Sequence, residues 1–154
     1  MTERSVIHAS FTIERTYDAT PARVFAAFAN PKEKARWFSG PPEWETTKVA
    51  MDFRVGGLEV NDGGPKGGPL SQFEGRYMDI VPNERIVYAY DMHLDDKRIS
   101  CSLTTIELKQ AGDGTRLTLT EHGAFLDGYD NPAGREEGTR EMLNALGASL
   151  RPLA

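Results

Sequence analysis

The fold of this chain is decided by residues 100–150, which read SCSLTTIELKQAGDGTRLTLTEHGAFLDGYDNPAGREEGTREMLNALGASL. Apolar and polar residues alternate over 102–109 and again over 115–122, as they do in a β-strand with one buried face. The Gly-Asp-Gly sequence at 112–114, between these stretches, is typical of a tight turn. This part of the chain is therefore predicted to form a β-hairpin.

The sequence after the hairpin predicts a loop over 122–130 and then one amphipathic helix. Asn131-Pro132 is a typical helix start, because Asn can cap the first turn and Pro fits its first position. The apolar residues at helical spacing are Met142, Leu143, Leu146 and Leu150, and Glu136, Arg140 and Glu141 are available for the solvent side. Gly138 and Gly147 weaken a helix, so we expect them to allow its backbone to approach a sheet closely. A helix lying on a curved sheet leaves a space between them, and this space is the predicted functional site.

The residues before this hairpin are predicted to add five strands and two short helices. The predicted strands are 8–17, 44–53, 54–61, 72–80 and 85–93, the predicted helices are 21–29 and 31–38, and a Gly- and Pro-rich loop is predicted over 62–69. Strands combined in this way with helices at the ends are typical of the α+β class with an antiparallel sheet. The expected order is β-α-α-β-β-β-β-β-β-α, in one domain over 1–154.

Composition predicts a soluble globular protein and argues against several classes. The chain has 154 residues, 39 % hydrophobic and 27 % charged, with a net charge of -5. An acidic chain without a basic stripe is not expected to bind nucleic acid. No run approaches the roughly 18 apolar residues of a membrane span, and the first residues lack the apolar core of a signal peptide. The lone Cys101 cannot form an internal disulfide, which favours a cytoplasmic location.

Several short motifs, in order along nearly the whole chain, resemble those of one superfamily. They are residues 19–28 (ATPARVFAAF), Pro31 followed by 35–38 (ARWF), Gly56-Gly57, 75–77 (GRY), 81–88 (VPNERIVY), 114–120 (GTRLTLT) and the terminal helix. On these motifs the chain resembles the SRPBCC or START-like superfamily, also called birch-pollen-allergen-like. Within it, the chain looks like homologues of the C-terminal domain of the heat-shock ATPase activator.

This resemblance implies the helix-grip fold, in which a curved antiparallel sheet of about seven strands wraps around a long C-terminal helix. The superfamily includes lipid and hormone carriers, polyketide cyclases, aromatase-like enzymes and chaperone partners. Many relatives carry Gly-Trp near the start of the last helix, where this chain has Glu137-Gly138-Thr139. A smaller group at this position either widens the cavity or repacks it.

Aromatic and apolar residues are the main candidates for ligand binding. The predicted ligand-binding residues are Trp37, Trp44, Phe53, Tyr88, Tyr90, Met92, Phe125, Met142 and Leu146. Buried Tyr and Trp keep a polar group that needs a partner, which suits a ligand with apolar and polar parts. Tyr88, Tyr90 and Met92 share one face of a strand, and they contact the ligand if that face is concave. If it is convex, Val87 and Ala89 do so instead.

Candidates for acid–base chemistry are few. Glu121 and His122 are the weak catalytic candidates, and as neighbours on a strand they cannot both face one pocket. His8 and His93 are expected at the surface. Arg54 and Glu121 are the charged residues whose burial would indicate a site. The scattered histidines and Cys101 lack the spacing of zinc ligands, so no metal is expected, and the sequence indicates no cofactor. Residues 63–69 are rich in glycine, but they lack the Gly-Lys-Ser/Thr sequence that ends a phosphate-binding loop.

Three functions follow in order of preference. The first is binding of a small hydrophobic or amphipathic molecule in the cavity. The second is interaction with a chaperone through the surface, which requires an exposed apolar patch or a charged face. The third is an enzyme of the cyclase or hydrolase kind. An exposed edge strand would permit a homodimer.

Overall fold

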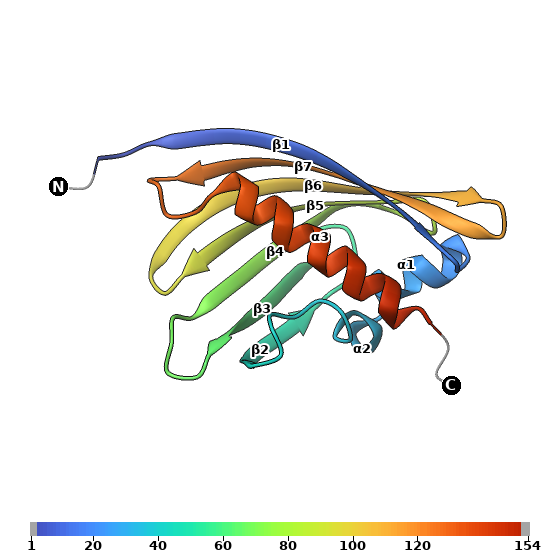
Figure 1. The fold of residues 1–154 in the computed structure, drawn as a ribbon, viewed down its shortest axis with the longest axis horizontal. Coiled ribbons are helices and arrows are strands. Elements are labelled where there is room, and N and C mark those ends of the chain that lie inside the picture. The colour runs from blue at the N-terminus through green and yellow to red at the C-terminus, as the bar shows by residue number, and fades with distance from the viewer. Residues whose placement is uncertain (1–2, 152–154) are drawn as a thin grey trace.

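The computed structural model describes residues 3–151 and contains one seven-stranded sheet and three helices (Figure 1). The elements are β1 (Val6–Tyr17), α1 (Pro21–Ala29), α2 (Pro31–Lys34), β2 (Trp44–Met51), β3 (Leu58–Pro65), β4 (Ser71–Val81), β5 (Arg85–Leu94), β6 (Lys97–Ala111), β7 (Gly114–Leu126) and α3 (Pro132–Ser149). The strand order is β1-β7-β6-β5-β4-β3-β2, and every neighbouring pair is antiparallel. This confirms the predicted α+β class and element order.

The long helix α3 crosses the hollow side of the curved sheet, as the helix-grip fold requires (Figure 1). Its start follows the predicted signal, because the Asn131 side chain accepts hydrogen bonds from the backbone N–H groups of Ala133 and Gly134. At its other end, the Tyr17 hydroxyl of β1 donates a 2.7 Å hydrogen bond to the Leu143 carbonyl oxygen. The first strand and the last helix are thereby joined.

The two short helices lie at one end of the sheet and help to close the core there (Figure 1). Thr20 caps α1 and Asn30 caps α2, and a proline follows each cap. The buried apolar cluster that they join comprises Ile13, Tyr17, Val24, Ala27, Phe28, Trp37, Tyr77, Ile86, Ile106, Leu108, Leu117, Leu119, Leu143 and Leu146. Within residues 3–151, no helix is both long and apolar enough to cross a membrane.

The structure shows which face of β5 is directed toward the cavity, a point that the sequence did not decide. Ile86 and Tyr90 are buried, and Tyr88, Tyr90 and Met92 lie on the concave side, toward α3. The alternative, in which Val87 and Ala89 face the cavity, is wrong. The cross-strand partners of Tyr90 are Gly75 on β4 and Ser102 on β6, so Tyr90 stands near the middle of the sheet.

The glycine-rich stretch after residue 62 differs from the prediction. Gly63 and Gly64 belong to β3, and the turn begins only after Pro65. A Cβ on Gly63 would lie 2.8 Å from the Glu45 carbonyl oxygen, so the missing side chain allows close strand contact rather than a loop. Conversely, the predicted strand over 54–61 begins only at Leu58, since Gly56 has a φ of 85° within a turn.

Two further boundaries were also wrong. β7 continues to Leu126 because it pairs with β1 as far as Val6, so the predicted loop over 122–130 is shorter. The second short helix ends at Lys34 rather than near residue 38. Gly147 approaches the Tyr17 ring closely, as expected, but a Cβ on Gly138 would meet no atom within 4 Å. Gly138 therefore leaves space instead of packing against the sheet.

Candidate functional site

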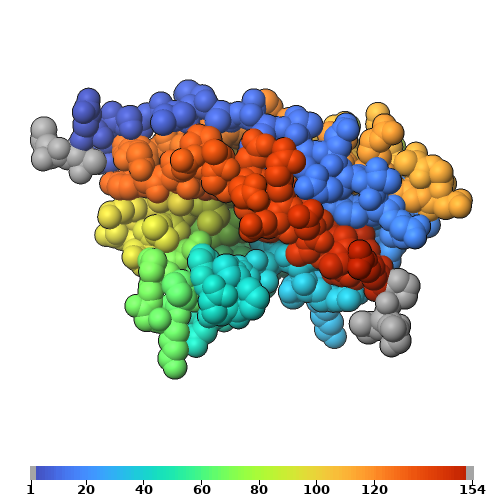
Figure 2. All heavy atoms as spheres, viewed as in Figure 1, coloured from blue at the N-terminus to red at the C-terminus, as the bar shows by residue number. Residues whose placement is uncertain are grey.

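A cavity of about 600 Å³ lies between the first part of α3 and the concave face of the sheet. Its outlet is visible as a recess between α3 and the segment around residues 40–46 (Figure 2). The aromatic residues that line it are Phe28, Trp37, Phe38, Trp44, Phe73, Tyr88 and Tyr90. Gly134 and Gly138 form part of the α3 wall, and their lack of side chains keeps that wall open.

The rings on the sheet side form a continuous surface. Phe73 and Tyr90 are stacked with ring centroids 4.9 Å apart, and Phe38 meets Phe73 edge-on at 5.1 Å. Tyr88 extends this surface, with its ring 5.9 Å from that of Tyr90. Flat faces and edges of this kind fit an apolar or aromatic ligand body.

A buried carboxylate, Glu121 of β7, lies at the inner side of the cavity. The side chain of Tyr90 donates a 2.9 Å hydrogen bond to Oε2, and that of Thr104 donates one of the same length to Oε1. Burial raises the pKa of Glu121 above its ordinary value, and the hydrogen bonds and the nearby Arg135 oppose this shift. The Tyr90 hydroxyl keeps its proton, because burial first and Glu121 second raise its pKa.

Arg135 of α3 closes the same end of the cavity. Its guanidinium donates hydrogen bonds of 3.0 Å to the Tyr90 hydroxyl, 2.8 Å to Ser100 Oγ and 2.6 Å to Asp130 Oδ2. It also lies over the Tyr90 and Phe125 rings, at 5.7 and 5.3 Å. Arg135 is thus fixed by contacts to β5, β6 and β7 and to the loop before α3.

Lys34 of α2 forms a second buried polar group on the wall. Its ammonium lies 2.6 Å from Glu59 Oε1, and the Tyr77 hydroxyl donates a hydrogen bond to the same oxygen. The ammonium also lies 4.4 Å from the Phe38 ring centroid. Burial lowers the pKa of Lys34, and Glu59 opposes this change. Burial is also the main cause that raises the pKa of Tyr77, so this phenol keeps its proton.

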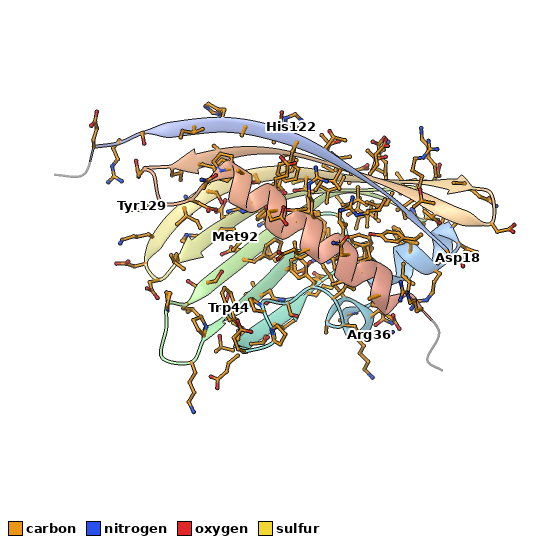
Figure 3. All side chains as sticks on the ribbon, in the orientation of Figure 1. Asp18, Arg36, Trp44, Met92, His122 and Tyr129 are labelled. Carbon is orange, nitrogen blue, oxygen red and sulfur yellow. The ribbon has the colours of Figure 1, made fainter. Side chains whose placement is uncertain are left out.

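Six of the nine predicted ligand-binding residues line the cavity: Trp37, Trp44, Tyr88, Tyr90, Met92 and Met142. Trp44 and Met92 lie on the same side of the sheet as α3 (Figure 3). The other three lie outside the wall. Phe53 packs between Phe25 and Tyr77, Phe125 is covered by Arg135, and Leu146 is buried in the apolar cluster.

The structure separates the two catalytic candidates. Glu121 faces the cavity, whereas His122 lies exposed on the outer face, beside β1 (Figure 3). His8 and Cys101 border the same shallow outer depression as His122. Arg54 is exposed and pairs with Asp52. Within residues 3–151, no three His, Cys, Asp or Glu side chains are placed to hold a metal ion. An acid–base role in the cavity would therefore fall to Glu121 with Tyr90.

Sequence reasoning missed Lys34, Glu59 and Arg135. For Arg135 a signal existed, because it precedes Gly138 by three positions and Met142 by seven, so all three share one helix face. For Lys34 the local pattern gives no such signal. Its exposed neighbour Lys32 has the same chemistry, and the burial of Lys34 depends on Glu59, 25 residues away.

Comparison with known proteins identifies a family and close structural relatives. The family described as Activator of Hsp90 ATPase homolog 1-like protein matches residues 18–151. A crystal structure of a protein from Rhizobium loti is 50% identical, with a TM-score of 0.88, and the match covers 94% of this chain and 99% of that one. A Rhizobium leguminosarum protein is 43% identical, with a TM-score of 0.92 and coverage of 97% and 98%.

More distant matches show the fold alone. The AHSA1-like protein from Aeromonas hydrophila is 19% identical, with a TM-score of 0.70, and the match covers 95% of this chain and 98% of that one. No curated protein shows significant sequence similarity to the chain.

Proposed function

Because the chain belongs to the family of Activator of Hsp90 ATPase homolog 1-like proteins, we propose that it uses the helix-grip cavity to bind a small hydrophobic or amphipathic molecule. The observation that carries this proposal is the cavity of about 600 Å³ beside α3. Its size falls in the range of ligand pockets, roughly 300–1,000 Å³. Such pockets combine an apolar lining with a few placed polar groups, which is the composition found here.

The arrangement of the wall indicates how the ligand is oriented. An apolar body is expected against the Phe73 and Tyr90 rings, with Met142 of α3 on the opposite side. A polar group is expected at the inner end, beside Glu121 and Arg135. The open entrance near Trp44 allows the ligand to enter without unfolding of the sheet.

Tryptophan fluorescence offers a direct test, because both tryptophans of the chain, Trp37 and Trp44, line the cavity. We expect the uncharged dye Nile red to bind saturably at one site and to quench this fluorescence. The variant Gly138→Leu places a side chain in the open space and should weaken dye binding about tenfold or more. Gly138→Ala is the matched control and should change it less than about threefold.

The outcome that contradicts the proposal is equally defined. If Nile red does not bind saturably, or if it binds Gly138→Leu as tightly as the unmodified chain, the cavity is not the binding site. Native mass spectrometry of freshly purified protein adds an independent readout, since a retained ligand appears as a defined mass increment. Circular dichroism of each variant establishes that the fold is kept.

A chaperone-associated role is the second candidate, and exposed apolar residues on the outer face favour it. Leu58 and Leu103 are exposed there, in one row across the sheet, with Arg76 and Ala89 between them. This role predicts that the purified protein changes the ATPase rate of an Hsp90 chaperone, and that Leu103→Asp abolishes the change. An unchanged rate contradicts it.

The proposal also includes a cytoplasmic location for the protein. The edge strand β1 could pair with the same strand of a second copy and so form a homodimer.

A further inference from the structure

We propose that the ligand of this cavity is an organic amine, in which a single ammonium group is attached to an apolar or aromatic body. The inference rests on the proposed function, because it names the chemical class of the molecule that the cavity takes. It follows from the charges on the cavity wall, from one buried carboxylate without a cationic partner, and from the rings around it.

Both cations on the wall already have a carboxylate of their own. The Lys34 ammonium lies 2.6 Å from Glu59, and the Arg135 guanidinium lies 2.6 Å from Asp130. An anionic ligand at either cation would meet the carboxylate that is already beside it, and the repulsion between the two negative charges would weaken its binding. The two cations therefore do not form a prepared anion site.

Glu121 is the carboxylate that remains. Its side chain lines the cavity and the residue is only 3% exposed, yet within residues 3–151 no lysine, arginine or histidine nitrogen lies within ion-pair distance of it. Its hydrogen bonds come from the hydroxyls of Tyr90 and Thr104, which are neutral. A buried carboxylate is stabilised most by a cation, and a ligand ammonium would supply one.

The rings beside Glu121 are suited to the same charge. An ammonium over an aromatic face is attracted to the ring electrons, most strongly where water is excluded. The protein already uses these rings in this way, since Arg135 lies over Tyr90 and Lys34 lies over Phe38. An amine near Glu121 would meet the stacked Phe73 and Tyr90 pair.

The charges at the entrance of the cavity also favour a cationic ligand. Glu45 and Glu141 line it, both are exposed, and neither forms an ion pair among the described residues. With Glu121 and Asp130, four carboxylates line the cavity, against the two cations Lys34 and Arg135. Lys34 is in addition neutralised by Glu59, which lies outside the lining. This excess of negative charge attracts a cationic ligand and repels a fatty acid or another carboxylate.

Three probes that share one naphthalene body test the inference: naphthylethylamine, naphthylethanol and naphthylpropionic acid. Calorimetric titration of the full chain at low salt and neutral pH should show the amine binding about tenfold or more tighter than the alcohol, and the acid binding most weakly. This comparison needs no variant, so it does not depend on how a substitution folds.

The variant Glu121→Gln then assigns the preference to one residue. It should remove the advantage of the amine over the alcohol while the alcohol binds about as before. Glu137→Gln removes the same charge from an exposed position of α3 outside the cavity and should keep the preference. The inference is overturned if the acid binds tightest, or if Glu121→Gln leaves the preference for the amine intact. Either result would still show that the cavity binds ligands, so the proposed function would stand. If none of the three probes binds, the proposed function fails with it.

Discussion

The two halves of α3 meet the same sheet in opposite ways. In the second half, Leu143 and Leu146 are buried, and Gly147 allows the helix to contact the Tyr17 ring. In the first half, Gly134 and Gly138 face the cavity, and a Cβ on Gly138 would touch nothing within 4 Å. One half of the helix therefore packs directly against apolar side chains, and the other half lines the cavity.

This difference explains how an open cavity persists in a small domain. Protein interiors normally close around empty space, because unfilled volume costs packing energy. Here the packed end fixes the position of the helix through the Tyr17 hydrogen bond to Leu143. At the open end Arg135 holds a paired charge that resists collapse, and Lys34 of α2 holds a second paired charge elsewhere on the cavity wall.

The largest expected effect comes from breaking the charge pair that Lys34 forms on the cavity wall. Lys34→Met leaves the Glu59 carboxylate buried without its cation and should lower the free energy of unfolding by about 3–5 kcal/mol. The double variant Lys34→Met/Glu59→Leu should recover most of this loss, because no charge is then stranded. Urea denaturation measures both.

Lys32→Met is the control for this comparison, since Lys32 is exposed on the same short helix. It should change the free energy of unfolding by less than about 0.5 kcal/mol. If Lys34→Met proves as mild as this control, the stability of the fold does not depend on the Lys34–Glu59 pair on the cavity wall.

An intermediate effect distinguishes the two glycines of α3 most directly. Gly138→Ala gains helix propensity without a clash and should raise the free energy of unfolding by up to about 1 kcal/mol. Gly147→Ala gains the same propensity, but its Cβ would lie 3.0 Å from the Tyr17 ring, which its hydrogen bond holds in place. We expect a net loss of about 1 kcal/mol. Thermal melting should show shifts of opposite sign, and shifts of equal sign would mean that both halves pack alike.

The smallest effect concerns Glu121 and depends on pH. Burial raises its pKa in the folded protein above 4.5, so folding favours the protonated carboxyl, and this contribution is lost as pH rises through the folded pKa. Glu121→Gln cannot ionise. The melting temperature of this variant relative to the unmodified chain should therefore increase from about pH 4 to about pH 8.

The groups that face Glu121 set the size of this change. Tyr90 and Thr104 donate hydrogen bonds to it and Arg135 lies nearby, so each of them lowers its pKa and opposes the effect of burial. A melting difference that stays constant over this pH range would show that these contacts fully offset burial.

Most of the fold could be predicted from the sequence because its signals are local. Alternation along β7 and the Asn131 cap depend on neighbours within a few residues, and they identified the strand and the helix correctly. Gly63 and Gly64 were assigned to a loop because glycine is equally suited to loops and to close strand contact. Only the position of Glu45 on the adjacent strand decides between the two.

The site was less predictable because its charges depend on distant partners. The aromatic residues Tyr88 and Tyr90 were placed on one strand face, yet the sequence did not tell which face is concave. Arg135 could have been found from its spacing to Met142. Lys34 could not, because its partner Glu59 belongs to another element.

The pairing of β1 has a consequence for the order of events during synthesis. Residues of β1 hydrogen-bond only with β7 in the sheet, so Val6 is matched with Leu126 and Tyr17 with Thr115. A ribosome therefore releases the first strand long before its neighbour exists. Such high contact order slows folding, and chaperone occupancy of the nascent chain should persist until the last hairpin has emerged.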